Sequence, residues 1–253
     1  MRRRRLLETA RQHGFMLFIG ETKGDPKLER RLLDAMLDRQ VDGIILASMF
    51  TRTRHLPSGL DQVPAVLLHG LPQQRASSIS AVVPDELAAG RAAAQLLLDA
   101  GHRSIHLVGA GPGADDVLPG TVAGTERLAG IRETLHEAGL ELASGHPLTE
   151  WLPPDGWRAT RQIIDEWGAG HAIITLNDRL AFGASQALHE TGLSVPVDVS
   201  VVSFDGPPLA DWLLPGLTTF AIPHHDFGRR VVELLVELIA GPARARSCRG
   251  PGK

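Results

Sequence analysis

Four polar side chains follow short apolar runs, at positions suited to binding a polar ligand. Ser48 follows GIILA, Asp85 follows AVVP, Asn177 follows AIITL and Asp205 follows VSVVSF. Carboxylates accept hydrogen bonds, whereas an amide or a hydroxyl both donates and accepts them. Open α/β sheets bind ligands at the carboxyl ends of their strands, so the set predicts a ligand site between two halves of the chain. An aspartate at such a junction also serves as a helix N-cap, which stays an alternative for Asp85 and Asp178.

Other motifs that might carry chemistry favour simpler interpretations. The glycines of 109–113 follow a strand but lack the G-x-G-x-x-G spacing, and Pro112 removes an amide donor. The adjacent residues of 224–226 (His-His-Asp) rarely converge on one ion, so a polar turn before a helix is favoured over a metal site. Neither a G-x-S-x-G nor an H-E-x-x-H motif occurs. We therefore expect no enzymatic activity, no metal and no cofactor.

Composition indicates an ordinary globular α/β protein. Of 253 residues, 43% are hydrophobic and 22% are charged, and the net charge of −3 argues against a polyanion-binding chain. The single cysteine, Cys248, excludes an internal disulfide and fits a reducing cytosol. The start, MRRRRLLETARQ, lacks the apolar segment of a signal peptide, and no run reaches the ~20 apolar residues of a membrane span. We therefore expect a cytoplasmic protein without a membrane partner.

Short apolar runs alternate with helical patterns along the chain, which is typical of a parallel sheet flanked by helices. Several runs are apolar at consecutive positions, as expected where both faces of a sheet are covered. The predicted strands are 15–19, 43–47, 65–68, 79–83, 105–108, 172–175 and 199–204, with a connecting run near Phe220. The predicted helices are 26–39, 85–100, 125–138, 156–167, 179–191 and 226–239.

Two α/β halves describe this alternation better than one sheet does. The first half extends to about Gly109, and a stretch rich in Gly, Ala, Pro and Asp (109–124) then interrupts the pattern. The second half extends to about Phe220. The polar, basic end of the chain has no periodicity, so 242–253 is predicted to be a disordered tail.

The first helix has an unusual beginning. Four arginines, 2–5, precede Leu6, Leu7 and Ala10 at helical spacing. Cations at a helix N-terminus oppose the macrodipole, and no Ser, Thr, Asp or Asn caps this turn. The helix is therefore expected to begin upstream of Met1. The arginine run has no interleaved aromatic residues, so it is interpreted as a solvated face and not as a nucleic-acid site.

Taken together, eight segments resemble the lactose-repressor (LacI/GalR) type of transcription regulators. Their order and spacing agree over roughly residues 8–241. The runs around GHRSI, LND-x-x-A-x-G and VP-x-DVSVVSFD, followed by PGLTTF, are specific in combination. The segments are VDGIILAS (41–48), PAVLLHG (64–70), VVPDELAAG (82–90), AGHRSIHLVG (100–109), ERLAGIRETLHEAGL (126–140), AIITLNDRLAFGASQAL (172–188), GLSVPVDVSVVSFDG (192–206) and PGLTTFAIPHHDFG (215–228).

The resemblance implies two doubly wound parallel-sheet lobes of the periplasmic-binding-protein type, joined by three crossing segments, with an effector in the cleft. The N-terminal lobe would comprise 1–109 and 223–241, without the first strand of the family, and the C-terminal lobe 110–222. A full-length relative begins with a helix-turn-helix and a hinge helix, which this sequence does not contain. Operator DNA would therefore be bound only through an N-terminal domain absent from this chain.

The resemblance also implies which residues contact the effector. Trp151 matches a position where the family often places an aromatic ring that stacks on the ligand, and this set fits a sugar or a similar polyol. Two alternatives remain, because Arg127 can pair with Glu126 or Glu133 and Trp151 can belong to the core. The other implied contacts, together with Ser48 at its strand end, are Asp85, Arg127, Asn177 and Asp205.

The function implied is that of the effector-sensing domain of a DNA-binding repressor. Effector would favour one arrangement of the lobes and so change the spacing of two heads on a two-fold operator, which requires a homodimer. A sugar-binding protein of a transport system shares the fold and is the alternative. The lack of a signal peptide and the DVSVVSFD and PGLTTF runs favour the regulator.

Overall fold

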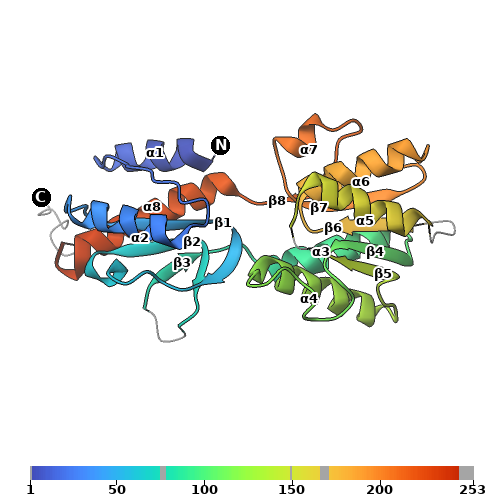
Figure 1. The fold of residues 1–253 in the computed structure, drawn as a ribbon, viewed down its shortest axis with the longest axis horizontal. Coiled ribbons are helices and arrows are strands. Elements are labelled where there is room, and N and C mark those ends of the chain that lie inside the picture. The colour runs from blue at the N-terminus through green and yellow to red at the C-terminus, as the bar shows by residue number, and fades with distance from the viewer. Residues whose placement is uncertain (1, 75–77, 149, 166–170, 245–253) are drawn as a thin grey trace, which may run out of the picture. The chain divides into compact units, whose positions relative to one another are not determined.

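The structure is a computed structural model that describes residues 2–74, 78–148, 150–165 and 171–244 (Figure 1). The chain divides into unit 1, formed by Met1–Pro84 and Pro223–Lys253, and unit 2, formed by Asp85–Ile222. Each unit contains a parallel β-sheet packed against helices, which confirms the predicted α/β fold with two lobes. Within the described residues, no helix is both long enough and apolar enough to cross a membrane.

Unit 1 contains a three-stranded parallel sheet in the order β1-β2-β3. Alternate side chains of its strands point to opposite faces, and each face packs against different helices. Val66 and Leu68 belong to a core cluster with residues of α1 and α8, whereas Ile44 and Ala65 pack with Leu33 of α2. The elements are α1 (Arg2–Gln12), α2 (Pro26–Leu37), β1 (Ile44–Arg54), a short 3-10 turn (Leu60–Gln62), β2 (Ala65–Pro72), β3 (Ser80–Val82) and α8 (His224–Arg244).

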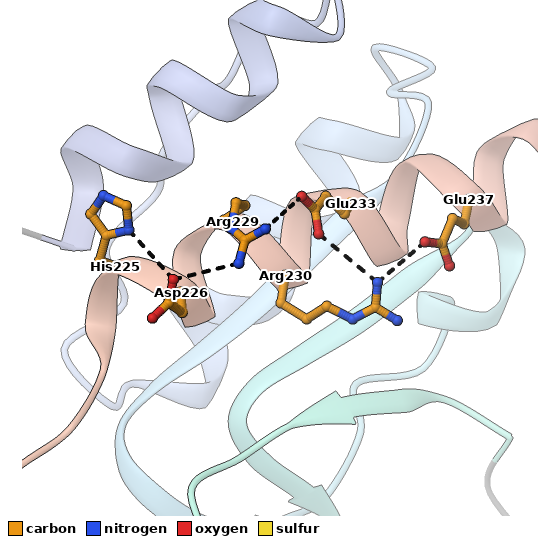
Figure 2. A network of polar contacts seen from close by, with 6 residues as sticks. All are labelled: His225, Asp226, Arg229, Arg230, Glu233 and Glu237. Carbon is orange, nitrogen blue, oxygen red and sulfur yellow. Dashed lines mark hydrogen bonds and ion pairs between the residues drawn. The ribbon is translucent and has the colours of Figure 1, made fainter.

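Helix α8 is amphipathic, with one apolar face and one charged face. Val231, Val232 and Leu235 are buried in the unit 1 core. Figure 2 shows the charged face, on which alternating acids and bases form a continuous line of contacts. These side chains are largely exposed, so each ion pair contributes less than ~1 kcal/mol to the free energy of folding. The row of ion pairs therefore forms a solvated face of α8 more than it stabilises the fold. Its members are His225, Asp226, Arg229, Arg230, Glu233 and Glu237.

The end of α8 lies later than the sequence predicts. Helical geometry is broken at Gly241, which has φ 60° and ψ 170°, and 242–244 then form a further helical turn. The prediction of a disordered tail over 242–253 is therefore wrong for its first three residues. Its remainder, 245–253, which includes Cys248, lies outside the described residues.

Unit 2 contains a five-stranded parallel sheet in the order β5-β4-β6-β7-β8. Its central strands are buried at consecutive positions, as the sequence pattern predicts for a sheet covered on both faces. The strands are β4 (Ser104–Gly109), β5 (Ser144–Pro147), β6 (His171–Thr175), β7 (Ser200–Asp205) and β8 (Thr218–Ala221). The helices are α3 (Glu86–Asp99), α4 (Val122–Glu137), α5 (Pro153–Asp165), α6 (Asp178–Glu190) and α7 (Leu209–Trp212).

Paired glycines let two pairs of helices in unit 2 approach backbone to backbone. A Cβ atom at Gly90 of α3 would overlap the main chain at Arg127 of α4, and one at Gly130 would overlap the carbonyl of Leu87. Gly156 of α5 and Gly183 of α6 meet the opposite helix in the same way, at Leu180 and Pro153 respectively. The glycines therefore fix how α4 lies on α3, and with it the position of Arg127.

The predicted boundary between the lobes at Gly109 is wrong. The family resemblance places residues 85–109 in the N-terminal lobe, but they form α3 and β4 of unit 2. Strand β4 pairs with β5 and β6, and α3 packs against α4, so these elements bury their apolar faces in the second core. The sequence pattern predicts both β4 and α3 correctly, but it does not show that they belong to unit 2.

The predicted strand 15–19 is also not formed. This segment has no regular secondary structure, and within the described chain no strand pairs with it. An extended segment becomes a strand only when a neighbour completes its hydrogen-bond ladder. The sequence pattern therefore identifies 15–19 as an apolar segment. Whether the segment forms a strand depends on a neighbouring strand to which it can hydrogen-bond.

Candidate ligand-binding site

Unit 2 contains five of the six predicted site residues. Asp85 begins α3, Arg127 lies on α4, and Trp151 comes just before α5. Asn177 follows β6, and Asp205 is the last residue of β7. Asp85 and Asn177 are both N-caps, accepting hydrogen bonds from Ala88 N (2.9 Å) and Leu180 N (2.8 Å). The capping alternative is therefore correct for Asp85, whereas Asn177 is a cap that the sequence does not suggest. A capping side chain still has acceptor capacity for a ligand.

The sixth residue, Ser48, belongs to unit 1. The sequence places it after a strand, but it lies within β1, where the pairing with β2 shifts register between Ala47 and Arg52. Its hydroxyl accepts a hydrogen bond from Arg54 Nη1 at 3.4 Å, and Arg54 in turn forms an ion pair with Glu29. Ser48 is thus part of a polar cluster of unit 1 with its own partners.

Arg127 is held by Glu86, a residue that the sequence analysis does not single out. Arg127 Nε donates to Glu86 Oε2 at 2.7 Å, and both side chains are buried, with 3% and 2% exposure. Arg127 Nη1 donates to the Leu176 carbonyl at 2.6 Å, and the guanidinium lies 4.5 Å from the centre of the Phe204 ring. The predicted partners Glu126 and Glu133 do not fill this role, and Glu133 pairs with Arg91 instead.

A sequence signal for this pair does exist. Glu86 lies four residues before Gly90, and Arg127 lies three residues before Gly130, so each charged residue shares a helix face with a glycine. Those glycines form the α3–α4 crossing, which brings the two charges together. One end of the guanidinium stays available, because Arg127 Nη2 has no hydrogen-bond partner within the described chain and is not among its buried unpaired atoms.

Trp151 belongs to the hydrophobic core of unit 2, which is one of the two alternatives left open by the sequence. Its side chain is 5% exposed, and its indole N–H donates to the Gly109 carbonyl at 3.1 Å. The ring packs against Gly124, where a side chain would approach it closely. The Trp151 carbonyl accepts from Asn177 Nδ2 at 3.3 Å, so Trp151 and Asn177 support each other.

Two acidic residues fix the chain at the end of β7: Asp205, which has a strained backbone, and Asp178, which is buried. Asp205 has φ 120°, a conformation that costs an L-residue about 1–3 kcal/mol and occurs most often at functional sites. The next residue, Gly206, donates its amide to Asp178 Oδ2 at 2.7 Å, and Thr219 Oγ1 donates to Asp178 Oδ1 at 2.8 Å. Asp178 is therefore not the N-cap that the sequence suits it for, since Asn177 caps α6 and Asp178 anchors the chain after β7.

Acidic groups dominate this end of unit 2. Burial raises the pKa of the Glu126 carboxyl, and the neighbouring carboxylates of Glu86 and Asp85 raise it further. Burial also raises the pKa of Asp178, although hydrogen bonds from Thr219, Ser203 and Gly206 and the charge of Arg127 oppose this change. Arg127 is already neutralised by Glu86, so the surroundings disfavour an anionic ligand.

The remaining groups suit hydroxyl recognition. Carboxylates accept hydrogen bonds from hydroxyls, and a guanidinium nitrogen donates to them. Among the described residues, no group of three or more His, Cys, Asp or Glu side chains is arranged to hold a metal ion.

Comparison with known proteins identifies the fold and its relatives. A family model described as a periplasmic binding protein-like domain matches residues 94–251. The ribose operon repressor of Escherichia coli (strain K12) is 30% identical over 234 residues, which cover 91% of this chain and 68% of the repressor. The HTH-type transcriptional regulator CelR of Thermobifida fusca is 31% identical over 239 residues, covering 91% of this chain and 66% of CelR. The chain thus spans about two thirds of the length of these curated relatives.

Solved structures give the same result. A structure described as a transcriptional regulator of the LacI family from Sanguibacter keddieii superposes with a TM-score of 0.78. It is 30% identical, and the match covers 94% of this chain and 84% of that one. These relatives are transcription regulators and not enzymes, and they do not favour the alternative of a transport protein.

Proposed function

The chain belongs to the LacI family of transcription regulators, as a periplasmic-binding-protein-like effector-sensing domain, and on this premise we propose that its effector is an uncharged sugar or polyol. The observation that carries the proposal is the buried Glu86–Arg127 pair: Glu86 follows the cap Asp85, and the guanidinium lies over Phe204, the residue before Asp205. Arg127 Nη2 can still donate a hydrogen bond, while the ion pair with Glu86 carries no net charge. A neutral polyhydroxyl compound satisfies such groups, whereas a phosphate or carboxylate would meet unbalanced negative charge.

The predicted site residues take different roles in this proposal. Asp85 and Asp205 accept hydrogen bonds from ligand hydroxyls, and Arg127 donates through Nη2. Asn177 contributes its amide next to the N-terminus of α6, and Trp151 forms the apolar support beneath it. Ser48 is the contact proposed from unit 1. These assignments rest on the position of each residue at a strand or helix end and on the family resemblance.

Regulation follows from a difference in affinity between two states. Effector that binds one arrangement of the units better than another shifts the population toward that arrangement. Operator DNA carries two related half-sites, so the proposal includes a homodimer in the cytoplasm. Recognition of DNA is assigned to a helix-turn-helix domain outside residues 1–253. The name of the ribose operon repressor makes D-ribose the first sugar to test.

A thermal-shift screen tests the proposed function. The chain is melted with D-ribose, other pentoses and hexoses, polyols, purines and sugar phosphates, each at several concentrations. A ligand present at 100 times its Kd stabilises the native state by about 2.7 kcal/mol, which raises the melting temperature measurably. We expect a neutral sugar or polyol to give such a shift, and Asp205→Asn to reduce the shift by at least half.

Matched controls distinguish a lost contact from a general loss of stability. Glu141→Gln removes an exposed carboxylate of unit 2 that has no hydrogen bond or ion pair within the described chain, and it should retain the full shift. Stabilisation by purines or sugar phosphates alone would contradict the proposal. Equal shifts in the Asp205 and Glu141 variants would remove Asp205 from the site.

A further inference from the structure

Helices α3 and α4 of unit 2 pack against each other along their length. Two ion pairs join them, Glu86–Arg127 near the start of α3 and Arg91–Glu133 further toward the C-terminus of both helices. The contacts therefore advance along α3 and α4 in the same direction, and the two helices begin at the same end of unit 2. At that end, the residue before each member of the buried pair is an acid.

These two acids, Asp85 and Glu126, interact electrostatically. Burial raises the pKa of the Glu126 carboxyl, and the negative charges of Glu86 and Asp85 raise it further. Asp85 uses Oδ1 to cap α3, and its Oδ2 accepts no hydrogen bond within the described chain. Glu126 forms neither a hydrogen bond nor an ion pair with any described residue. Three carboxylate oxygens at this end of unit 2 thus have acceptor capacity.

The position of Glu126 gives α4 no stabilising interaction. The helix begins at Val122, so Glu126 lies beyond the first turn, in which the macrodipole favours an acid. A cation three or four residues away on the helix would pair with it, but those positions hold Val122, Ala123, Ala129 and Gly130. A partly buried carboxylate that two neighbours repel lowers stability, and proteins retain such groups where function requires them.

Arg127 supplies a donor beside these acceptors. Its side chain is 3% exposed, and two of its nitrogen atoms donate to Glu86 and to the Leu176 carbonyl. The third, Nη2, has no hydrogen-bond partner within the described chain and is not among its buried unpaired atoms. A cation that is otherwise enclosed therefore keeps one nitrogen in a space that a ligand can enter.

We propose that Glu126 is an effector-binding residue, which together with Asp85 accepts hydrogen bonds from two adjacent hydroxyl groups of the effector. One of these hydroxyls accepts in turn from Arg127 Nη2, since a hydroxyl both donates and accepts. The inference rests on the proposed function and specifies it, because the group recognised in the sugar or polyol is a vicinal diol. An ammonium group is the competing occupant of two carboxylates, but it only donates and would leave Nη2 without an acceptor.

The unliganded chain provides the first test. Glu126→Gln removes a carboxylate that Glu86 and Asp85 repel, so it should raise the melting temperature at neutral pH. Glu141→Gln, at an exposed acid of unit 2 without a hydrogen bond or ion pair in the described chain, should leave the melting temperature unchanged. A lower melting temperature in Glu126→Gln would assign Glu126 a structural role and overturn the proposal.

Isothermal titration with D-ribose and the other neutral sugars of the thermal-shift screen provides the second test. Glu126→Ala should bind the best sugar roughly tenfold more weakly or worse, and Glu126→Gln, which retains a carbonyl acceptor, should lose less. Each monodeoxy analogue of that sugar is then titrated into the unmodified chain and into Glu126→Ala. The unmodified chain should require two adjacent hydroxyls, and Glu126→Ala should no longer distinguish the analogue that lacks one of them.

The outcomes separate this inference from the proposed function. If every deoxy analogue weakens binding by the same factor in the unmodified chain and in Glu126→Ala, the diol contact is overturned while a neutral effector stands. Tighter binding of an amino analogue of the sugar would also overturn it, because the carboxylates would then bind an ammonium group. If no neutral sugar or polyol of the screen binds, the proposed function fails and this inference fails with it.

Discussion

At the scale of single residues, the candidate site is built on the charge of Arg127, which is buried but paired with Glu86. Two arginine–glutamate pairs join α3 to α4, and they differ mainly in exposure. Glu86–Arg127 is buried, whereas Arg91–Glu133 has side chains that are 55% and 47% exposed. Removing one partner of a buried pair leaves an uncompensated charge in a poorly solvated place, whereas water replaces the partner of an exposed pair. The two pairs therefore provide an internal comparison.

Glu86→Gln is expected to reduce the free energy of unfolding by about 3 kcal/mol, because Arg127 keeps its charge without a counter-ion. Glu133→Gln should cost less than about 1 kcal/mol, since its partner remains hydrated. Urea unfolding of both variants beside the unmodified chain measures the difference. Similar losses in the two variants would contradict the distinction between a buried pair and an exposed one.

A buried histidine makes the stability of unit 2 depend on pH. His106 Nε2 lies 2.9 Å from His171 Nδ1, and His106 Nδ1 lies 2.8 Å from Ser144 Oγ. Burial, together with the nearby His171 and His146, lowers the pKa of His106 to about 4. The folded state therefore keeps this ring neutral, while the unfolded chain takes up a proton near pH 6.5. The stabilisation is complete above pH 6.5 and is lost as the pH falls toward 4.

This linkage predicts a loss of about 2 kcal/mol between pH 7.5 and pH 4.5 that His106→Gln does not share. Urea unfolding of both proteins at the two pH values isolates the contribution, because the carboxylates common to both cancel in the comparison. The same pH dependence in the unmodified chain and the variant would show that His106 does not cause it.

At the scale of elements, local patterns predict most helices and strands but not their partners. The buried strands β4, β6 and β7 are predicted because they are apolar at consecutive positions, and α2 because its leucines repeat at helical spacing. Strand β5 and helix α7 are missed. β5 (SGHP) holds glycine and proline and no run of β-branched residues, and α7 is only four residues long.

In the candidate site, too, the sequence predicts positions better than it predicts partners. Residues at strand and helix ends, such as Asp85 and Asn177, are predictable because junctions have a sequence signature. The partner of Arg127 has only an indirect signature, the spacing of Glu86 and Arg127 from Gly90 and Gly130. The reason is that Glu86 lies 41 residues away and reaches Arg127 only through the crossing of two helices. The burial of Trp151 likewise depends on Gly109 and Gly124, which come from other elements.

The crossing itself can be tested at Gly90. Gly90→Ala places a methyl group against the main chain of Arg127, so α3 and α4 must separate. Overpacking of this kind costs about 1–3 kcal/mol, which outweighs the helix propensity that alanine adds. Gly216→Ala is the control, because a Cβ atom there meets nothing within 4 Å and should be nearly neutral. Thermal melts rank the two, and a Gly90 variant as stable as the Gly216 variant would contradict a backbone contact.

At the scale of the whole molecule, the sequence gives the number of units but misplaces their boundary. Two alternating α/β halves are visible, yet the interruption over 109–124 marks a loop inside unit 2 and not the crossing between units. The crossings lie at Pro84 and at Ile222–Pro223, where strand β3 or β8 ends. Neither point has a change of composition, so only the pairing of β4 with β6 shows to which unit 85–109 belongs.

We propose that this chain senses an uncharged polyhydroxyl effector through an acidic site in which Glu86 neutralises Arg127. Isothermal titration of the chain with the best neutral sugar of the screen, and with the phosphate ester of the same sugar, tests it most directly. We expect the neutral sugar to bind at least tenfold more tightly than its phosphate ester, a difference of about 1.4 kcal/mol in the free energy of binding. Tighter binding of the phosphate ester would contradict a neutral effector, because it would require a free cation where the structure has an ion pair.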